Sequence, residues 1–323
     1  MNPERAAPER NVLLRHLEAM IRIRRFEEKV MELRKQQIIV GSIHLGIGQE
    51  ALYVGAHAAL SPEDRVFATY RGHGWALACG APPAALMAEL LGRETGVCKG
   101  RGGSAHFSAP DWGFYGENSI VGAGAAVALG AALSAKREGK GRVVLTAFGE
   151  GAMNQGAVHE AMNFAAYQDL PLIFVCENNT YSELTPTRRM VRNDQMYQRA
   201  AAYGMPGVRV DGNDPEAMCR TTASFVAAAR RGEGPALVEA MTQRLVGHYY
   251  GDMQSYRPKG ELAEARKAEP IVRARQALRQ LGVSAAELDA LETRVNDDIE
   301  AATREALEAP LADPQQAAEH LYA

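Results

Sequence analysis

The sequence predicts an α/β fold, a doubly wound parallel sheet with helices on both faces, extended by helices at its N- and C-terminal ends. One observation is a pair of continuous apolar runs, at 142–148 and 171–176, as found in strands buried on both faces of a parallel sheet. Another is that helix-length segments alternate with the strand-like runs, which is typical of β-α-β units. The third is the tail after residue 258, whose composition of Ala, Glu and Arg predicts helices.

Apolar residues at helical spacing predict a first helix over 11–36 and a second over 49–60. The elements predicted after them are, in order, a strand at 65–70, a glycine-containing loop at 93–118, a strand at 142–148, a helix at 156–167, a strand at 171–176, a helix at 194–203, a strand at 208–211, a helix at 215–230 and a strand at 236–241. From residue 259 the chain is predicted to be helical, with a break at 282–284. We therefore divide it into an N-terminal helical extension (1–40), an α/β domain (41–258) and a C-terminal helical extension (259–323).

Composition excludes several classes of function. The chain has 36 Lys and Arg against 39 Asp and Glu, a net charge of −3, so no basic surface indicates a nucleic acid partner. Its longest apolar run, 120–133, is mostly Ala and Gly and is shorter than the roughly 20 residues of a membrane span. The four cysteines are far apart, and the N-terminal segment is charged, which together predict a cytoplasmic protein.

Polar residues follow two consecutive predicted strands. Glu150 stands between Gly149 and Gly151 after one strand, and Asn179 follows the next. Because the carboxyl ends of parallel strands meet at one edge of a sheet, we expect the carboxylate and the amide to lie together. Mg²⁺ takes few protein oxygens and completes its octahedron with phosphate oxygens and water. The glycines would let backbone N–H groups approach a diphosphate, and a following helix N-terminus would favour its charge.

Each of these features has a plainer interpretation when taken alone. A Gly-Glu-Gly turn commonly only connects a strand to a helix, and Asn-Asn commonly only makes a turn, but their spacing favours the metal site. The glycine-rich run at 122–126 is faintly similar to a dinucleotide fingerprint; it follows no predicted strand, and we favour close helix packing. His106 is interpreted as a solvated loop residue, and the cysteines as small buried hydrophobic residues.

The stretch 149–181 resembles the thiamine diphosphate motif, in which Gly-Asp-Gly is followed after about 30 residues by Asn-Asn. More closely, the chain resembles the α subunit of the decarboxylating first component of 2-oxo acid dehydrogenase complexes, including those for pyruvate and acetoin. Further motifs follow that family's order, namely SIHL at 42–45 with QEA at 49–51, YRGHG at 70–74, KGRGGS at 99–104, IVGA at 120–123, and GH at 247–248 with SYR at 255–257. The resemblance covers about residues 15–260.

The resemblance implies a thiamine diphosphate-binding fold and a role for each matching position. Those implied to hold Mg²⁺ are Glu150, the side chain of Asn179 and the backbone carbonyl of Tyr181. Those implied to bind the cofactor are Tyr70, Arg71 and His248 at the diphosphate, the backbone of Gly151 and Ala152, and the backbone near Ser119 and Val121 at the aminopyrimidine. The implied catalytic residues are His44, His73 and His248, the first two facing the substrate. The family usually has aspartate where this chain has Glu150, so the extra methylene must shift the carboxylate or the metal.

The resemblance implies the α subunit of a thiamine diphosphate-dependent pyruvate or acetoin dehydrogenase that passes an acyl group to a lipoyl acyltransferase. It also implies dependence on a β subunit in an α2β2 heterotetramer, since a glutamate from a second α/β domain must activate the cofactor. A branched-chain 2-oxo acid dehydrogenase α subunit is the nearest alternative, but branched-chain members lack histidine at the positions of His44 and His73. Alternatives of other classes are an NAD-dependent Rossmann oxidoreductase, suggested by the run at 122–126, and a non-catalytic homologue, suggested by Glu150.

Overall fold

The computed structural model describes residues 9–319, with a six-stranded sheet at its centre. The strands are β1 (Arg65–Thr69), β2 (Phe114–Asn118), β3 (Val144–Gly149), β4 (Leu172–Asn178), β7 (Gly207–Asp211) and β8 (Ala236–Met241). Their order is β2-β1-β3-β4-β8-β7, and every neighbouring pair is parallel. β2 lies on one side of β1, whereas β3 and β4 follow on the other side. The direction in which successive strands are added to the sheet therefore reverses between β1 and β3. Doubly wound folds bind ligands at such a reversal of strand order. The parallel sheet confirms the predicted α/β fold class.

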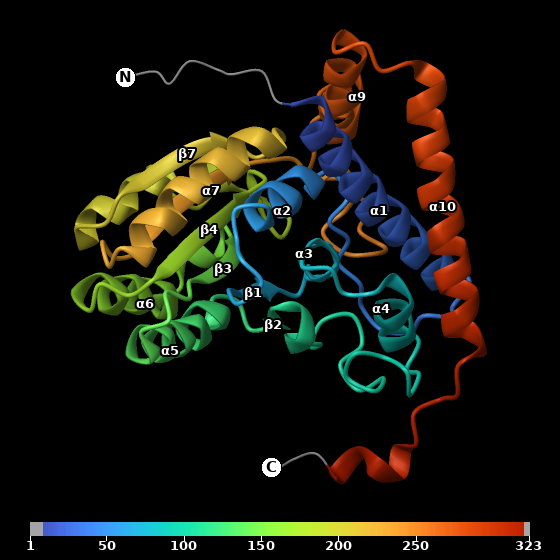
Figure 1. Cartoon of the computed structure of the whole chain (residues 1–323), viewed down its shortest axis with the longest axis horizontal. Helices are drawn as coiled ribbons and strands as arrows, with labels where there is room; N and C mark the ends of the chain where they lie inside the picture. Colours follow the sequence, from blue (N-terminus) through green and yellow to red (C-terminus); the bar gives the residue numbers. More distant parts are fainter. Residues whose placement is uncertain (1–8, 320–323) are drawn as a thin grey trace.

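Helices cover both faces of the sheet (Figure 1). Those on one face are α5 (Ala123–Glu138) and α6 (Gly156–Tyr167), and those on the other are α2 (Glu50–His57) and α7 (Pro215–Arg230). Along β3, Val144 and Phe148 pack into the core under α5 and α6, whereas Leu145 and Ala147 pack into the core under α7. Alternate residues of the strand thus enter two separate cores, which explains why its sequence is continuously apolar.

The first helix and the helices at the end of the described chain lie side by side (Figure 1). The remaining helices are α1 (Arg10–Lys35), α3 (His73–Ala78), α4 (Pro83–Leu90), α8 (Glu261–Lys267), α9 (Pro270–Gln280) and α10 (Ala285–Glu308). Arg25 of α1 pairs with Glu292 of α10, and Lys29 pairs with Glu300 at 2.6 Å. The buried apolar residues of α1 and α10 belong to the same core as those under α7, so α1 is packed into the body of the molecule.

The structure corrects four expectations. The predicted loop at 93–118 ends in β2, an edge strand in which only Phe114 is buried and which therefore lacks an apolar pattern. The glycine-rich run at 122–126 consequently does follow a strand and begins α5. The helix predicted over 194–203 is a 3-10 helix, η4 (Met196–Tyr203). Helices α3 and α4 were not predicted, because both are short and buried on most sides.

The other predicted strands and long helices are present, and the predicted break at 282–284 separates α9 from α10. Within residues 9–319, no helix combines the length and the apolar character needed to cross a bilayer. Short 3-10 helices complete the structure, namely η1 (Pro110–Trp112), η2 (Ala152–Asn154), η3 (Thr187–Arg189) and η5 (Pro314–Ala318), with a small hairpin of β5 (Tyr181–Ser182) and β6 (Thr185–Pro186).

Candidate active site

A pocket lies at the carboxyl ends of β1, β3 and β4, beside the point where the strand order reverses. It encloses about 870 Å³ of free space, counted to its open mouth. Its walls come from the segments that follow β1, β2, β3 and β4, and from the loop after β8. The pocket is thus built by chain segments that are distant in sequence and are brought together by the sheet.

Backbone lines one wall of the pocket, at the turn after β3 and at the start of α5. Gly151 has no room for a side chain, since a Cβ there would lie 2.2 Å from Ser182 Oγ. Gly122 precedes α5 with φ of +85°, a left-handed conformation that glycine adopts readily. A helix N-terminus offers free N–H groups and a favourable dipole to an anion. The turn after β3 enters the short helix η2 before α6, so the helix that begins at the pocket is α5, not the one expected.

Glu150 places a buried carboxylate in the pocket, and within residues 9–319 no cationic side chain forms an ion pair with it. The residue is 1% exposed, and its one side-chain hydrogen bond is accepted from Thr187 Oγ1 at 3.3 Å. Burial raises the pKa of the Glu150 carboxyl to about 7, although its own backbone N–H, that of Asn179, the Thr187 hydroxyl and the charge of Arg244 act in the opposite direction. A cation beside this carboxylate would compensate the cost of burying its charge.

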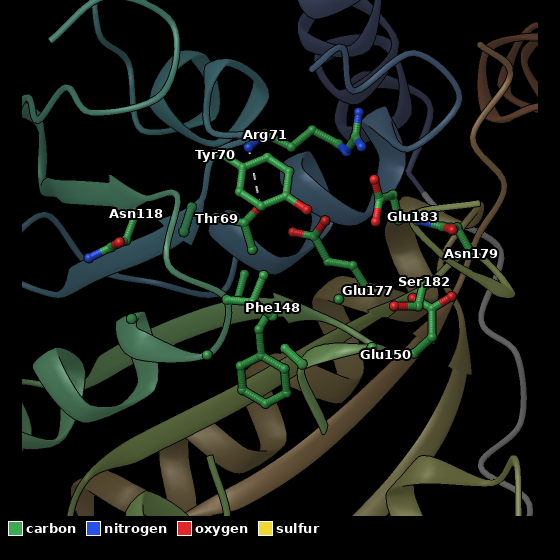
Figure 2. Close-up of a pocket in the computed structure, with 18 of the residues that line it drawn as sticks. Thr69, Tyr70, Arg71, Asn118, Phe148, Glu150, Glu177, Asn179, Ser182 and Glu183 are labelled. Carbon is green, nitrogen blue, oxygen red and sulfur yellow. Dashed lines mark hydrogen bonds between the residues drawn. The ribbon is translucent and has the colours of Figure 1, made fainter. Parts of the chain in front are cut away.

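Asn179 and Glu150 lie on the same side of the pocket, together with Ser182 and Glu183 (Figure 2). The parallel pairing of β3 with β4 sets Gly149 opposite Glu177, which brings the two following segments to one edge of the sheet. The side chain of Asn179 accepts from the backbone N–H of Tyr181 and donates to Gln49, both at 3.3 Å. The hydrogen bond from Tyr181 is long, so the amide oxygen of Asn179 can also bind a cation.

The hydroxyl of Tyr181 is engaged elsewhere, because it donates to Glu261 of α8 at 2.7 Å. The backbone carbonyl is the oxygen that Tyr181 can offer to the pocket. A carboxylate, an amide oxygen and a backbone carbonyl form the hard oxygen donor set that Mg²⁺ takes when phosphate supplies its other ligands. The residues present fit the metal and diphosphate that the sequence predicts.

Two buried guanidinium groups provide positive charge. Arg71 donates to the backbone carbonyls of Leu45 at 2.5 Å and of His248 at 3.1 Å. Arg244 donates through its terminal nitrogens to the Tyr256 hydroxyl, the backbone carbonyl of Glu183 and His248 Nδ1. Its buried Nε has no partner among the described residues. Burial and the nearby Arg71 lower the pKa of Arg244 to about 10. Within residues 9–319 neither arginine pairs with a carboxylate, which leaves their charge available to an anion.

Aromatic and imidazole rings border the pocket beside these arginines. The ring of His44 lies 4.5 Å from that of Tyr70 and 5.0 Å from that of His248, between ring centres. Burial, together with Arg71, lowers the pKa of His44 to about 3 and that of His248 to about 4. Both imidazoles are therefore neutral at pH 7. His248 Nδ1 accepts from Arg244 at 3.2 Å, whereas the buried Nδ1 of His44 has no partner in the described chain.

The structure brings most of the predicted site residues together. Those that line the pocket are Tyr70, Arg71, Val121, Glu150, Gly151, Ala152, Asn179, Tyr181 and His248, and His44 contacts two of them through its ring. Ser119 stands just outside the lining, where its hydroxyl meets His106 Nε2 at 3.3 Å. His73 is buried behind the pocket, with both ring nitrogens bonded to other side chains.

Several lining residues were missed from the sequence. Arg244 precedes His248 by four residues in the loop after β8. Its closeness in sequence to a histidine of a family motif could have indicated that it belongs to the site. Glu177, which directly precedes the Asn-Asn pair, also lines the pocket. Its carboxylate accepts hydrogen bonds from Trp75 at 2.7 Å and from Gln49 at 3.1 Å. No local pattern distinguishes such a structural carboxylate from Glu150.

Comparison with known proteins identifies the family. A sequence model of the dehydrogenase E1 component matches residues 18–315. The chain is 43% identical over 283 residues to the α subunit of acetoin:2,6-dichlorophenolindophenol oxidoreductase of Bacillus subtilis, covering 88% of this chain and 85% of that one. It is 41% identical over 316 residues to the α subunit of the same name from Cupriavidus necator, covering 97% and 95%. It is also 40% identical over 280 residues to the pyruvate dehydrogenase E1 component subunit alpha of Rhizobium meliloti, covering 86% and 80%. The resemblance inferred from the motifs is confirmed: the chain belongs to the dehydrogenase E1 component family.

Proposed function

We propose that this protein is the α subunit of a thiamine diphosphate-dependent dehydrogenase, acting in the cytoplasm on pyruvate or acetoin. One observation carries the proposal: a buried carboxylate at Glu150 shares a pocket with two arginines, and in the described part of the chain none of the three forms an ion pair. A metal–diphosphate group would satisfy both kinds of charge at once. The Rossmann alternative is displaced by the family match, which spans residues 18–315. The glycine-rich run that suggested it follows β2 and begins α5 at this pocket.

Each part of the pocket has a role in this proposal. Glu150, Asn179 and the backbone of Tyr181 would hold Mg²⁺, while Arg71 and Arg244 would face the diphosphate. The backbone at Gly151, Ala152 and the start of α5 would donate N–H groups to its oxygens. Thiamine diphosphate would supply the carbanion that attacks the substrate carbonyl, and the protein would orient it and manage protons.

Two histidines are suited to proton transfer at the reacting carbonyl. His44 and His248 are neutral at pH 7 and lie with their rings in contact beside the pocket. Contact with a substrate is not supported for His73, which is buried. His44 also favours pyruvate or acetoin over branched 2-oxo acids, in agreement with the names of the relatives, which are α subunits of acetoin and pyruvate enzymes.

A β subunit is part of the proposal, in an α2β2 assembly that delivers the acyl group to a lipoyl acyltransferase. The relatives are named as α subunits, so each has a partner chain. At the mouth of the pocket Ile120 is 71% exposed and Val121 is 44% exposed, which suits an apolar surface that another chain covers. The isolated chain should therefore show no 2-oxo acid-dependent dye reduction, and turnover that depends on a glutamate of its own would exclude the two-subunit arrangement.

The metal site is tested by calorimetric titration of thiamine diphosphate with and without Mg²⁺. Asn179→Ala should weaken binding at least about tenfold in Mg²⁺, because the metal loses one of its few protein ligands. Asn163→Ala, an exposed asparagine on α6, is the matched control and should bind like the wild type. Equal affinity in the Asn179→Ala variant and the wild type would refute the site. Glu150→Asp should retain Mg²⁺-dependent binding, since the family usually has aspartate there.

A further inference from the structure

A buried hydrogen-bonded chain links α1 to the glycine-rich loop at residues 93–108. His73 Nδ1 lies 2.9 Å from Glu27 Oε2, and His73 Nε2 lies 3.0 Å from Ser104 Oγ. The imidazole stacks on Phe107 at a ring-centre distance of 6.1 Å, and Phe26 meets its edge at 5.9 Å. With both nitrogens bonded and both sides packed, the ring of His73 is fixed in one orientation.

The carboxylate of Glu27 decides the direction of the hydrogen bonds. A carboxylate only accepts, so His73 must donate through Nδ1–H. In the neutral ring Nε2 then accepts the hydroxyl proton of Ser104. The other oxygen of Glu27 accepts from the backbone N–H of Gly46 at 2.8 Å. One buried carboxylate on α1 thus holds the segment that follows His44, the start of α3 and the glycine-rich loop.

The same loop reaches the pocket at its other end. His106 Nε2 lies 3.3 Å from the hydroxyl of Ser119, and the two residues after Ser119 line the pocket. Glu117 of β2 accepts from the backbone N–H of Gly72 at 3.0 Å, which ties the start of α3 to the same wall. A displacement of Ser104 would therefore move the loop that supports this wall.

The order Ser104–His73–Glu27 is that of a hydrolytic triad, but the surroundings are different. An oxyanion site needs backbone N–H groups aimed at the attacked carbonyl. The N–H groups of Gly102 and Gly103, which precede the serine, donate instead to Glu89 at 2.6 and 3.2 Å. The geometry favours a structural relay over a nucleophile.

We propose that Glu27 and His73 are positioning residues, which set the glycine-rich loop against the pocket through Ser104. The N-terminal helix then helps to shape the pocket, although no residue of α1 lines it. The effect on turnover rests on the proposed dehydrogenase function. The effect on hydrogen exchange in the loop is independent of that function, so the prediction for the loop and the proposed function can be refuted separately.

The relay is tested with Ser104→Ala, His73→Asn and their double variant. Asparagine keeps a donor near Glu27 and loses the contact with Ser104. We expect backbone amides at 102–106 to exchange hydrogen about five- to tenfold faster in each variant of the full chain, since one hydrogen bond is lost. The double variant should be no worse than either single one, because both changes break the same contact. Ser104→Thr should restore protection, and Ser108→Ala, in the same loop, is the matched control.

Kinetics of the complete enzyme separate positioning from proton transfer. A positioning role predicts that Ser104→Ala and His73→Asn both raise KM about fivefold with kcat within about twofold of the wild type. A general acid or base at His73 would instead lower kcat by about 10²–10⁴, with Ser104→Ala unaffected, and would overturn the proposal. Unchanged exchange at 102–106 in Ser104→Ala would overturn it without reference to activity.

The direction of the relay has its own measurement. Glu27→Gln keeps an acceptor for Gly46 and places an amide donor at His73 Nδ1, so the ring must take the Nε2–H tautomer. ¹⁵N NMR of labelled histidine should show Nδ1–H in the wild type and its loss in the variant. Glu32→Gln, an exposed position on the same helix, should leave the His73 signals unchanged. An Nε2–H tautomer already present in the wild type would overturn the assigned direction.

Discussion

Two buried glutamates of this protein, Glu89 and Glu150, have opposite surroundings. Glu89, in the last turn of α4, is surrounded by backbone donors from the glycine-rich loop. These are the N–H groups of Cys98 at 2.7 Å and Gly100 at 2.9 Å on one oxygen, and of Gly102 at 2.6 Å and Gly103 at 3.2 Å on the other. The carboxylate of Glu150 accepts one side-chain hydrogen bond, from the Thr187 hydroxyl at 3.3 Å. Its pKa is raised because the effect of burial is larger than that of the nearby donors.

The contrast separates two uses of the same residue type. A carboxylate whose acceptor positions are filled by the chain acts as a structural anchor, and removing it leaves buried N–H groups unpaired. A buried carboxylate that the chain leaves under-satisfied makes folding less favourable, which is the expected cost of a site prepared for a cation.

Glu89→Ala should produce the largest loss of stability, about 3–5 kcal/mol, because several buried N–H groups lose their acceptor together. The free energy of unfolding in urea measures this loss. Glu94→Ala, an exposed glutamate of the same loop, is the control and should change the stability by less than about 0.5 kcal/mol. A loss of under 1 kcal/mol in Glu89→Ala would remove the distinction between the two glutamates.

Glu150→Gln should leave the metal-free protein as stable as the wild type or more stable at pH 8, by up to about 3 kcal/mol, because it removes a buried charge. The pKa of Glu150 in the folded chain, about 7, lies above its ordinary value of 4.5. The carboxyl therefore costs stability as pH rises from about 4.5 to 7, and this cost is fully present above pH 7. Urea unfolding of both proteins from pH 5 to pH 8 tests the sign. Destabilisation by the substitution at pH 8 would contradict it.

His248 extends the comparison to the cationic side of the pocket, where the expected effect on stability has a similar size and the opposite dependence on pH. Its pKa in the folded chain, about 4, lies below the ordinary 6.5, so protons favour the unfolded chain. This histidine should therefore lower stability as pH falls from about 6.5 toward 4, and His248→Gln should reduce that loss. Inorganic diphosphate should raise the pKa of His248, because its negative charge offsets the positive charges of Arg71 and Arg244. NMR titration of the ring protons of His248 can follow this change. A midpoint near 6.5 without diphosphate would refute the effect of the arginines.

Much of the site was predictable because it depends on strand ends. The apolar runs before Glu150 and Asn179 mark two buried strands, and neighbouring parallel strands deliver their following residues to one edge. The edge strand β2 was not predictable in the same way. It is short, contains a glycine and buries only Phe114, so no period of apolar residues distinguishes it from the loop before it.

Local spacing along the chain specifies the alternation of strands and helices, the polar residues at the strand ends and the family motifs. Which buried charges are neutralised depends on how distant segments pack together. Glu89 and Glu150 both follow or end short apolar segments, yet one meets a ring of backbone N–H groups and the other does not. The same holds for His73, whose partner Glu27 lies 46 residues away on α1. The physical reason is that solvation and pairing of a buried charge depend on every segment packed around it, and the strand order brings those segments from distant parts of the chain.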